Sequence, residues 1–374
     1  MLLVSIAGVP NLTTIYIYDH PRLISTKVSS TGMLSLIVTK DSLLIGMEQM
    51  VGLSTSLEEI AISECDSLDC FQLDLFPKIE RLDVANCLSL ESVCTREEPL
   101  ADFTSLRYLS ITDCPAFFTF PDGGLAAPNL TSLELRGCIN LISLPESMHS
   151  LLPSFENLKL VSLSELDSFP RSGLPSKLKS LCINCCSKLI DSRMLWDLQS
   201  LPSLSTFSIE DYEDMESFPE EAVLLPSTLT SLAIRSLWNL KSLNYKGFQH
   251  LTSLRELKIK NCYFLRSLPE EGLPSSLSSL QIRAVKLKHI IIGSLVNHAA
   301  VVVKKELDLM CYDLLYDMLS SLIGLQRHTL QRAIVCSLQN GNCLICERFT
   351  AKTLVRYAIS SYPDITSLVN GSFY

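Results

Sequence analysis

The sequence predicts an α/β repeat protein, a solenoid with a curved parallel β-sheet on its concave face, an irregular convex side and a partly helical C-terminal tail. Two observations predict this fold. The stretch LRELKIKNCYFLRSL, residues 254–268, has apolar residues at places one, four, six, nine, twelve and fifteen. The same pattern recurs in phase from Leu57 to Leu277, with starts 22 to 27 residues apart, so each copy is expected to form one coil of a stacked array.

Each copy is expected to form one short strand at places three to seven. In the copy that starts at Leu254, Leu257 and Ile259 stand two residues apart, so both side chains lie on one face of an extended chain. A turn at Cys262 follows. Pro269 then removes a backbone donor, so long helices are not expected on the convex side. The signature L-x-x-L-x-L-x-x-N/C with this period is that of leucine-rich repeats.

Three regions are expected along the chain. Residues 1–56 hold degenerate N-terminal repeats, residues 57–285 hold regular repeats, and residues 286–374 form a C-terminal helical tail or cap. The regular pattern ends where place twelve becomes polar, at Lys288. Apolar residues then recur at threes and fours from Leu307 to Leu325, which predicts an amphipathic helix. The alternative is that this tail is not a native domain.

Composition narrows the classes of partner. The chain has 374 residues, 47% of them hydrophobic, and can bury a large core. Its net charge of -9 argues against nucleic acid, whose phosphates need a basic protein surface. The apolar run Ile290–Val303 includes Asn297 and His298 and is shorter than the roughly 17 to 25 residues of a membrane-spanning helix. No membrane span is therefore expected.

The cysteines predict a reducing compartment. Six of the 14 cysteines occupy place nine of successive repeats, where a thiol serves as a small buried apolar group. We therefore expect reduced thiols and a cytoplasmic location. Cys343 and Cys346 form a C-x-x-C pair, but no second pair or suitably spaced histidine lies near them in the sequence, so no metal site is predicted.

No catalytic motif is recognisable in the sequence. The chain contains no GxSxG, GxGxxG or GxxxxGK[ST] segment and no HExxH pair. No nucleophile, base and orienting group can be assembled. The sequence thus predicts that the protein is not an enzyme and uses no cofactor, metal or nucleotide.

The concave face is the predicted binding surface. Places three, five and seven of each strand point away from the core, and in the last three coils they carry a basic patch. Such a patch favours an acidic protein partner, whereas the alternative is an ordinary solvated surface. The residues predicted to bind a partner are Arg235, Lys258, Lys260, Arg283, Glu134, Arg136 and Tyr108.

The segments GCINLISLPES and NCYFLRSLPEEGLPSSLSSL combine an N-C or G-C turn with SLP at the end of the unit. This combination resembles the leucine-rich repeat region of plant coiled-coil NB-LRR disease-resistance proteins, including the RPP13-like group, over residues 1–285. The resemblance implies repeats that recognise pathogen effectors, directly or through a guarded host protein. It also implies that the repeats fold back on the nucleotide-binding NB-ARC domain. The residues it offers for that contact are Arg235, Lys258, Lys260 and Arg283.

The sequence departs from that family at one point. No phosphate loop, GLPL motif or MHD motif is present, so the resemblance implies a truncated member that lacks NB-ARC and binds no ADP or ATP. The predicted function is therefore a non-catalytic recognition or regulatory module of plant innate immunity. The alternative is a generic intracellular repeat scaffold or ubiquitin-ligase adaptor. An extracellular receptor ranks third, because neither a signal peptide nor the LxGxIPxxL repeat form is seen.

Overall fold

A computed structural model describes most of the repeats and a few strands outside them. The residues described in full are 57–94, 103–219, 225–269, 272–283 and 285, and six further strands are described by their backbone. The helix expected from Leu307 to Leu325 and the Cys343–Cys346 pair lie outside the described residues. The chain divides into two compact units: Met1–Tyr212 with Glu220–Leu229, and Glu213–Pro219 with Thr230–Tyr374.

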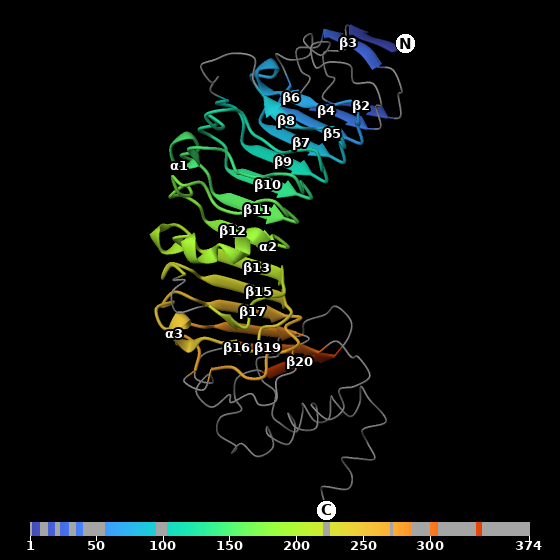
Figure 1. Cartoon of the computed structure of the whole chain (residues 1–374). Coiled ribbons are helices and arrows are strands. Elements are labelled where there is room, and N and C mark those ends of the chain that lie inside the picture. Colours follow the sequence, from blue (N-terminus) through green and yellow to red (C-terminus); the bar gives the residue numbers. More distant parts are fainter. Residues whose placement is uncertain are drawn as a thin grey trace, which may run out of the picture. The chain divides into compact units, whose positions relative to one another are not determined.

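The first unit is built on a parallel sheet with one strand from each coil (Figure 1). Neighbouring strands pair without shifts, so equivalent places of successive repeats lie side by side. From β5 onward each strand begins at place three, as predicted. The strands are β2 (Thr14–Tyr18), β4 (Ser35–Thr39), β5 (Glu59–Ser63), β7 (Arg81–Ala85), β9 (Tyr108–Thr112), β10 (Ser132–Arg136), β11 (Asn157–Val161), β12 (Ser180–Asn184) and β13 (Thr206–Tyr212).

The second unit contains a parallel sheet of the same kind. Two of its strands lie beyond Lys288, where the apolar repeat pattern ends, so the sheet continues past the regular repeats. The segment AVVVKK in one of them is rich in β-branched residues, which favour strands. The strands are β15 (Ser231–Leu237), β17 (Glu256–Lys260), β18 (Ser279–Arg283), β19 (Ala300–Lys305) and β20 (Ile334–Leu338).

The other side of each coil is irregular, as the prolines predict. Its described helices are at most five residues long. They are α1 (Met148–Leu151), α2 (Ser187–Asp191) and α3 (Tyr245–Phe248), with 3-10 turns at Leu73–Leu75, Arg193–Leu195 and Leu198–Ser200.

Three short parallel pairs are also present: β1 (Leu2–Ala7) with β3 (Leu23–Ser29), β6 (Cys70–Gln72) with β8 (Ser92–Cys94), and β14 (Ser217–Phe218) with β16 (Ser242–Leu243). The chain is a leucine-rich-repeat solenoid.

The core consists of the predicted apolar places stacked from coil to coil. Leu257 and Ile259 are fully buried, and so is Cys262 at place nine. The Cys262 Sγ donates to the carbonyl oxygen of Lys260 at 3.4 Å, which satisfies the thiol without a disulfide. Burial raises the pKa of Cys262 to about 11 and that of Cys138 to about 12, so these thiols stay protonated at neutral pH.

A left-handed residue occupies place eight of the regular repeats from the copy at Leu57 to the copy at Leu254, and it directly follows the strand in most of them, whereas β13 and β15 continue through it to place nine. Asn86, Asp113 and Asn261 have φ of 54°, 52° and 55°, a conformation that asparagine and aspartate tolerate better than most residues. The turn directs the backbone N–H at this place to the next coil, and Asn261 donates to the carbonyl oxygen of Arg283 at 3.0 Å. At Gly137, which has φ 63°, a Cβ atom would meet the Asp113 Oδ1 at 2.4 Å, so a larger residue there would have to displace the Asp113 side chain. This geometry explains the N-C and G-C pairs of the sequence.

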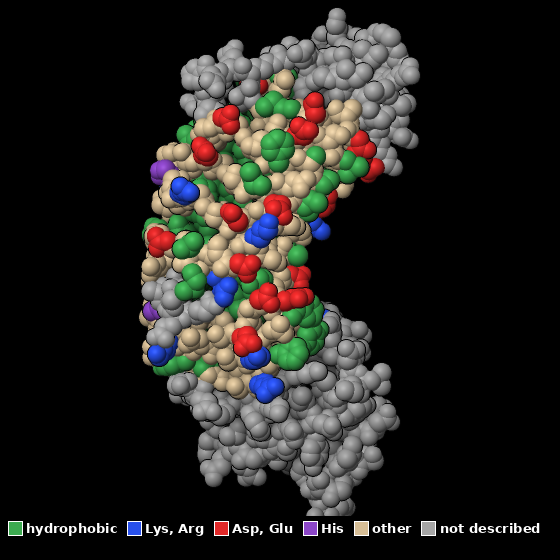
Figure 2. Space-filling view, in the orientation of Figure 1, with side chains coloured by type: hydrophobic (Ala, Val, Ile, Leu, Met, Phe, Trp, Pro, Cys, Tyr) green, Lys and Arg blue, Asp and Glu red, His purple; other side chains and the backbone are tan. Residues whose placement is uncertain are grey.

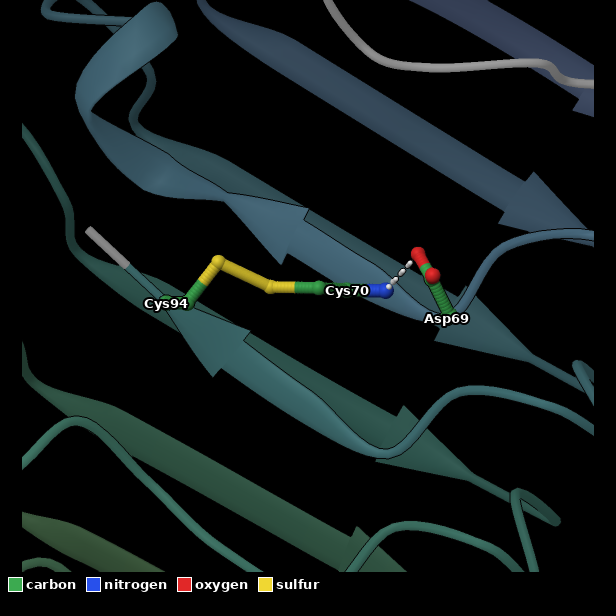
Figure 3. Close-up of a disulfide and its surroundings, with 3 residues drawn as sticks. All are labelled: Asp69, Cys70 and Cys94. Carbon is green, nitrogen blue, oxygen red and sulfur yellow. Dashed lines mark hydrogen bonds between the residues drawn. A yellow bond between two sulfur atoms is a disulfide. The ribbon is translucent and has the colours of Figure 1, made fainter. Parts of the chain in front are cut away.

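One pair of cysteines departs from the expected reduced state. Cys70 and Cys94 lie on the paired strands β6 and β8 with their Cα atoms 6.4 Å apart, and they form a disulfide (Figure 3). The Asp69 carboxylate accepts a hydrogen bond from the Cys70 backbone N–H at 2.7 Å. The expectation of reduced thiols is therefore corrected at this pair, because strand pairing brings the two residues within bridging distance. The six cysteines at place nine are free and buried, as predicted.

Candidate protein-binding surface

The side chains at places three, five and seven form the open face of each sheet, opposite the buried leucines. Strands such as β12, β17 and β18 show partly exposed residues at these places and buried residues between them. Because the strands pair in register, equivalent places form rows that run across the strands. Acidic, basic and hydrophobic side chains are interspersed on the described surface (Figure 2).

In the first unit, the open face carries a cluster centred on Tyr108. Arg81 lies over the Tyr108 ring, with its Cζ 3.7 Å from the ring centroid. The same guanidinium donates from Nε to Asp83 Oδ2 at 2.7 Å and from a terminal nitrogen to Oδ1 at 3.2 Å. Burial raises the pKa of Asp83 in spite of this ion pair. The residue pair was not predicted, and the only sequence signal is its i, i+2 spacing on one strand face.

Glu134 joins this cluster to the next strands. Its Oε1 accepts from the Lys159 Nζ at 2.7 Å and its Oε2 accepts from the Tyr108 hydroxyl at 3.4 Å. The hydrogen bond to Glu134 raises the pKa of Lys159. Two of the predicted residues, Tyr108 and Glu134, are thus brought into contact. Arg136 lies two residues further along β10 and is exposed.

In the second unit, Glu256 is the centre of a polar network. Its Oε2 accepts from the Lys258 Nζ at 2.8 Å and from the Ser231 hydroxyl at 2.9 Å, and its Oε1 accepts from the Gln281 side chain at 3.3 Å. Burial acts to raise the pKa of Glu256, but the hydrogen bonds from Lys258 and Ser231 outweigh it and lower the pKa. The predicted cation Lys258 therefore lies in an ion pair, and its charge is balanced locally.

The other three predicted cations share one row at place seven, where β17 and β18 end and two residues before the end of β15. Arg235 pairs in register with Lys260, and Lys260 pairs with Arg283. We call these three residues the basic row. Adjacent parallel strands lie about 4.8 Å apart, so the row places one cation on each successive strand at that interval. Lys304 occupies the next register position, on β19, and was not predicted.

The polar side chains of the open face make contacts with one another. Among the described residues, no group of three or more histidines, cysteines, aspartates or glutamates could hold a metal ion. Polar side chains of the open face pair with one another, within one strand in the Arg81–Asp83 ion pair and across strands in the Lys159–Glu134 ion pair. No helix in the described part of the chain is long and apolar enough to cross a membrane.

The chain is similar in sequence to parts of two longer plant proteins. The chain is 39% identical over 226 residues, 60% of its length, to the Arabidopsis thaliana protein named "Putative disease resistance protein At3g14460". It is 27% identical over 222 residues, 57% of its length, to "Protein SUPPRESSOR OF npr1-1, CONSTITUTIVE 1" of the same plant. The matches span 16% and 14% of the lengths of those two proteins. The chain is therefore similar to one part of a plant disease-resistance protein.

Solved structures of leucine-rich repeat proteins have lower sequence identity to the chain than the two plant proteins. The leucine-rich repeat domain of the type III effector XopL matches with a TM-score of 0.36 and 18% identity, over 73% of this chain and 77% of that one. InlP of Listeria monocytogenes matches with a TM-score of 0.30 and 16% identity, over 74% of this chain and 63% of that one. No family model matches the chain.

Proposed function

We propose that the chain is a non-catalytic recognition or regulatory module of plant immunity that works in the cytoplasm. In this proposal the open face binds a protein, which is a pathogen effector, a guarded host protein or an NB-ARC domain. The similarity to part of a disease-resistance protein supports the biological setting.

The observation that carries the proposal is the basic row. Arg235, Lys260 and Arg283 follow one another in register, and among the described residues the row contains no carboxylate in this unit. A row of basic side chains on a protein surface favours an acidic partner, because complementary charges speed association and select among partners. Lys258 lies on the same face, in an ion pair with Glu256.

The test is co-precipitation from plant cells that express the chain beside tagged NB-ARC domains of related resistance proteins. The variant is Lys260→Glu with Arg283→Glu. We expect recovery of the bound domain to fall about 10-fold at low salt, with a smaller effect at high salt, because screening weakens exposed charges.

The matched control is Lys78→Glu with Arg266→Glu, which makes the same change in net charge at exposed sites away from the basic row. Circular dichroism confirms that both variants are folded. Equal losses in the two variants would show that net charge alone matters. Unchanged binding by the first variant would remove the basic row from the interaction.

A further inference from the structure

Three aromatic side chains of the second unit lie exposed just beyond the strand ends. Trp238 and Tyr263 are each 39% exposed, and Phe264 is 54% exposed. The Trp238 and Tyr263 rings stack on one another with centroids 5.7 Å apart and planes inclined by 22°. We call these three residues the aromatic strip. It follows β15 and β17 along the chain, on the turns after the strands.

The fold does not require aromatic residues there. Trp238 and Tyr263 occupy place ten of their repeats, and the same place holds Asp66, Ser187 and Glu213 in other coils. Place ten is thus a solvent-facing position that polar residues also fill. Exposed tryptophan and tyrosine side chains are typical of the residues that dominate binding energy in protein interfaces.

An acidic turn lies beside the aromatic strip. Glu213 and Asp214 occupy places ten and eleven of the preceding coil, and both are exposed. The stacking of these coils is shown at place thirteen, where the Lys241 Nζ lies 2.6 Å from Glu216 Oε1 and the Lys241 N–H donates to the Glu216 carbonyl oxygen at 2.8 Å. By the same stacking, Glu213, Trp238 and Tyr263 follow one another in order.

We propose that the aromatic strip and the acidic turn bind a basic, arginine-bearing segment of a partner protein. A guanidinium group stacks on an aromatic face and pairs with a carboxylate, and the stacking order of the coils puts these two kinds of group on neighbouring turns. The basic row lies three residues earlier in each coil and on the open face, so the two surfaces select opposite charges. The inference concerns a second surface and does not depend on the proposed function of the basic row.

Trp238 supplies a native reporter for this binding. The chain has two tryptophans, and Trp196 is only 6% exposed, so quenching by acrylamide reports mainly on Trp238. The probe is a 12-residue peptide with four arginines among glycines and serines, and its counterparts carry lysine or glutamate in their place. We expect the arginine peptide to lower the quenching constant about 2-fold, with a weaker effect of the lysine peptide and none of the glutamate peptide.

Two variants of the full chain locate the site, with binding of fluorescein-labelled arginine peptide followed by anisotropy. Trp238→Leu should weaken binding about 5- to 10-fold, as expected for one aromatic–cation contact. Glu213→Gln with Asp214→Asn should weaken it several-fold and reduce its salt dependence. This second variant lies on an exposed turn and tests the site even if Trp238→Leu is poorly folded. The control is Leu195→Ser, which removes an 81% exposed apolar side chain elsewhere and should change nothing.

Three results would overturn the inference. The first is equal or better protection of Trp238 by the glutamate peptide, which would mean that the strip takes an acidic or purely apolar segment. The second is protection of Trp238 that rises with chain concentration together with dimers in light scattering, which would make a second copy the occupant. The third is no binding of the arginine peptide at millimolar concentration. Co-precipitation of NB-ARC domains is measured separately, so a negative result with the arginine peptide does not affect the proposal for the basic row.

Discussion

Removal of one stacked leucine should destabilise the second unit by a predictable amount. Leu257 is fully buried and lies in register between Leu232 and Leu280, which are also fully buried. Leu257→Ala deletes three carbon atoms, worth about 2.4 kcal/mol at about 0.8 kcal/mol each. The neighbours belong to coils fixed by their own strands and cannot close the gap, so a cavity term of about 1 kcal/mol adds to this. The expected total is about 3 to 4 kcal/mol.

The assay is hydrogen exchange of the backbone amides of β17, followed by mass spectrometry. In a repeat protein each coil contacts its neighbours only, so the loss should appear first as local opening of these strands. A loss of 3 to 4 kcal/mol corresponds to exchange that is faster by about 2 to 3 orders of magnitude. Urea unfolding followed by circular dichroism should show the same order of loss wherever the transition is cooperative.

The control lies in the same coil. Phe264→Ala removes a larger side chain that is 54% exposed, and it should cost well under half as much as Leu257→Ala. A loss of unfolding free energy below about 1 kcal/mol for Leu257→Ala would refute the reasoning. It would mean that the neighbouring coils move together and fill the cavity.

Two further predictions concern the turn and the polar network of the same unit. Asn261→Val places a β-branched residue at φ 55° and should lower stability by about 1 to 2 kcal/mol in thermal unfolding, whereas Asn261→Gly should cost far less. The pKa of Glu256 is lowered by folding, so its contribution is present above its unfolded pKa near 4.5 and is lost as the pH falls through the folded value. The urea midpoint of the chain should therefore fall as the pH drops below about 4.5, and this fall should be smaller in Glu256→Gln. The same pH dependence in the variant and the unchanged chain would contradict this role of Glu256.

The sequence by itself determined the structure of the single coil, that is, where its strand lies and which side chains it buries. Apolar residues such as Leu254, Leu257 and Ile259 recur in phase, and because side chains on a strand alternate between faces, this phase decides which groups go inside. It therefore predicted the strands at places three to seven, the buried cysteines at place nine and the irregular opposite side. The pattern carried no information past Lys288, where the sheet nevertheless continues through β19 and β20.

Only the tertiary structure decided which side chains meet. Lys258 looked like part of a basic patch, yet cross-strand contacts from Ser231 and Gln281 help to hold Glu256 beside it and the charges cancel. Trp238 and Tyr263 stand 25 residues apart in the sequence and stack because one coil lies on the next. The period of the repeat fixes which places become neighbours, but the pairing among them depends on side-chain reach, burial and charge at each place.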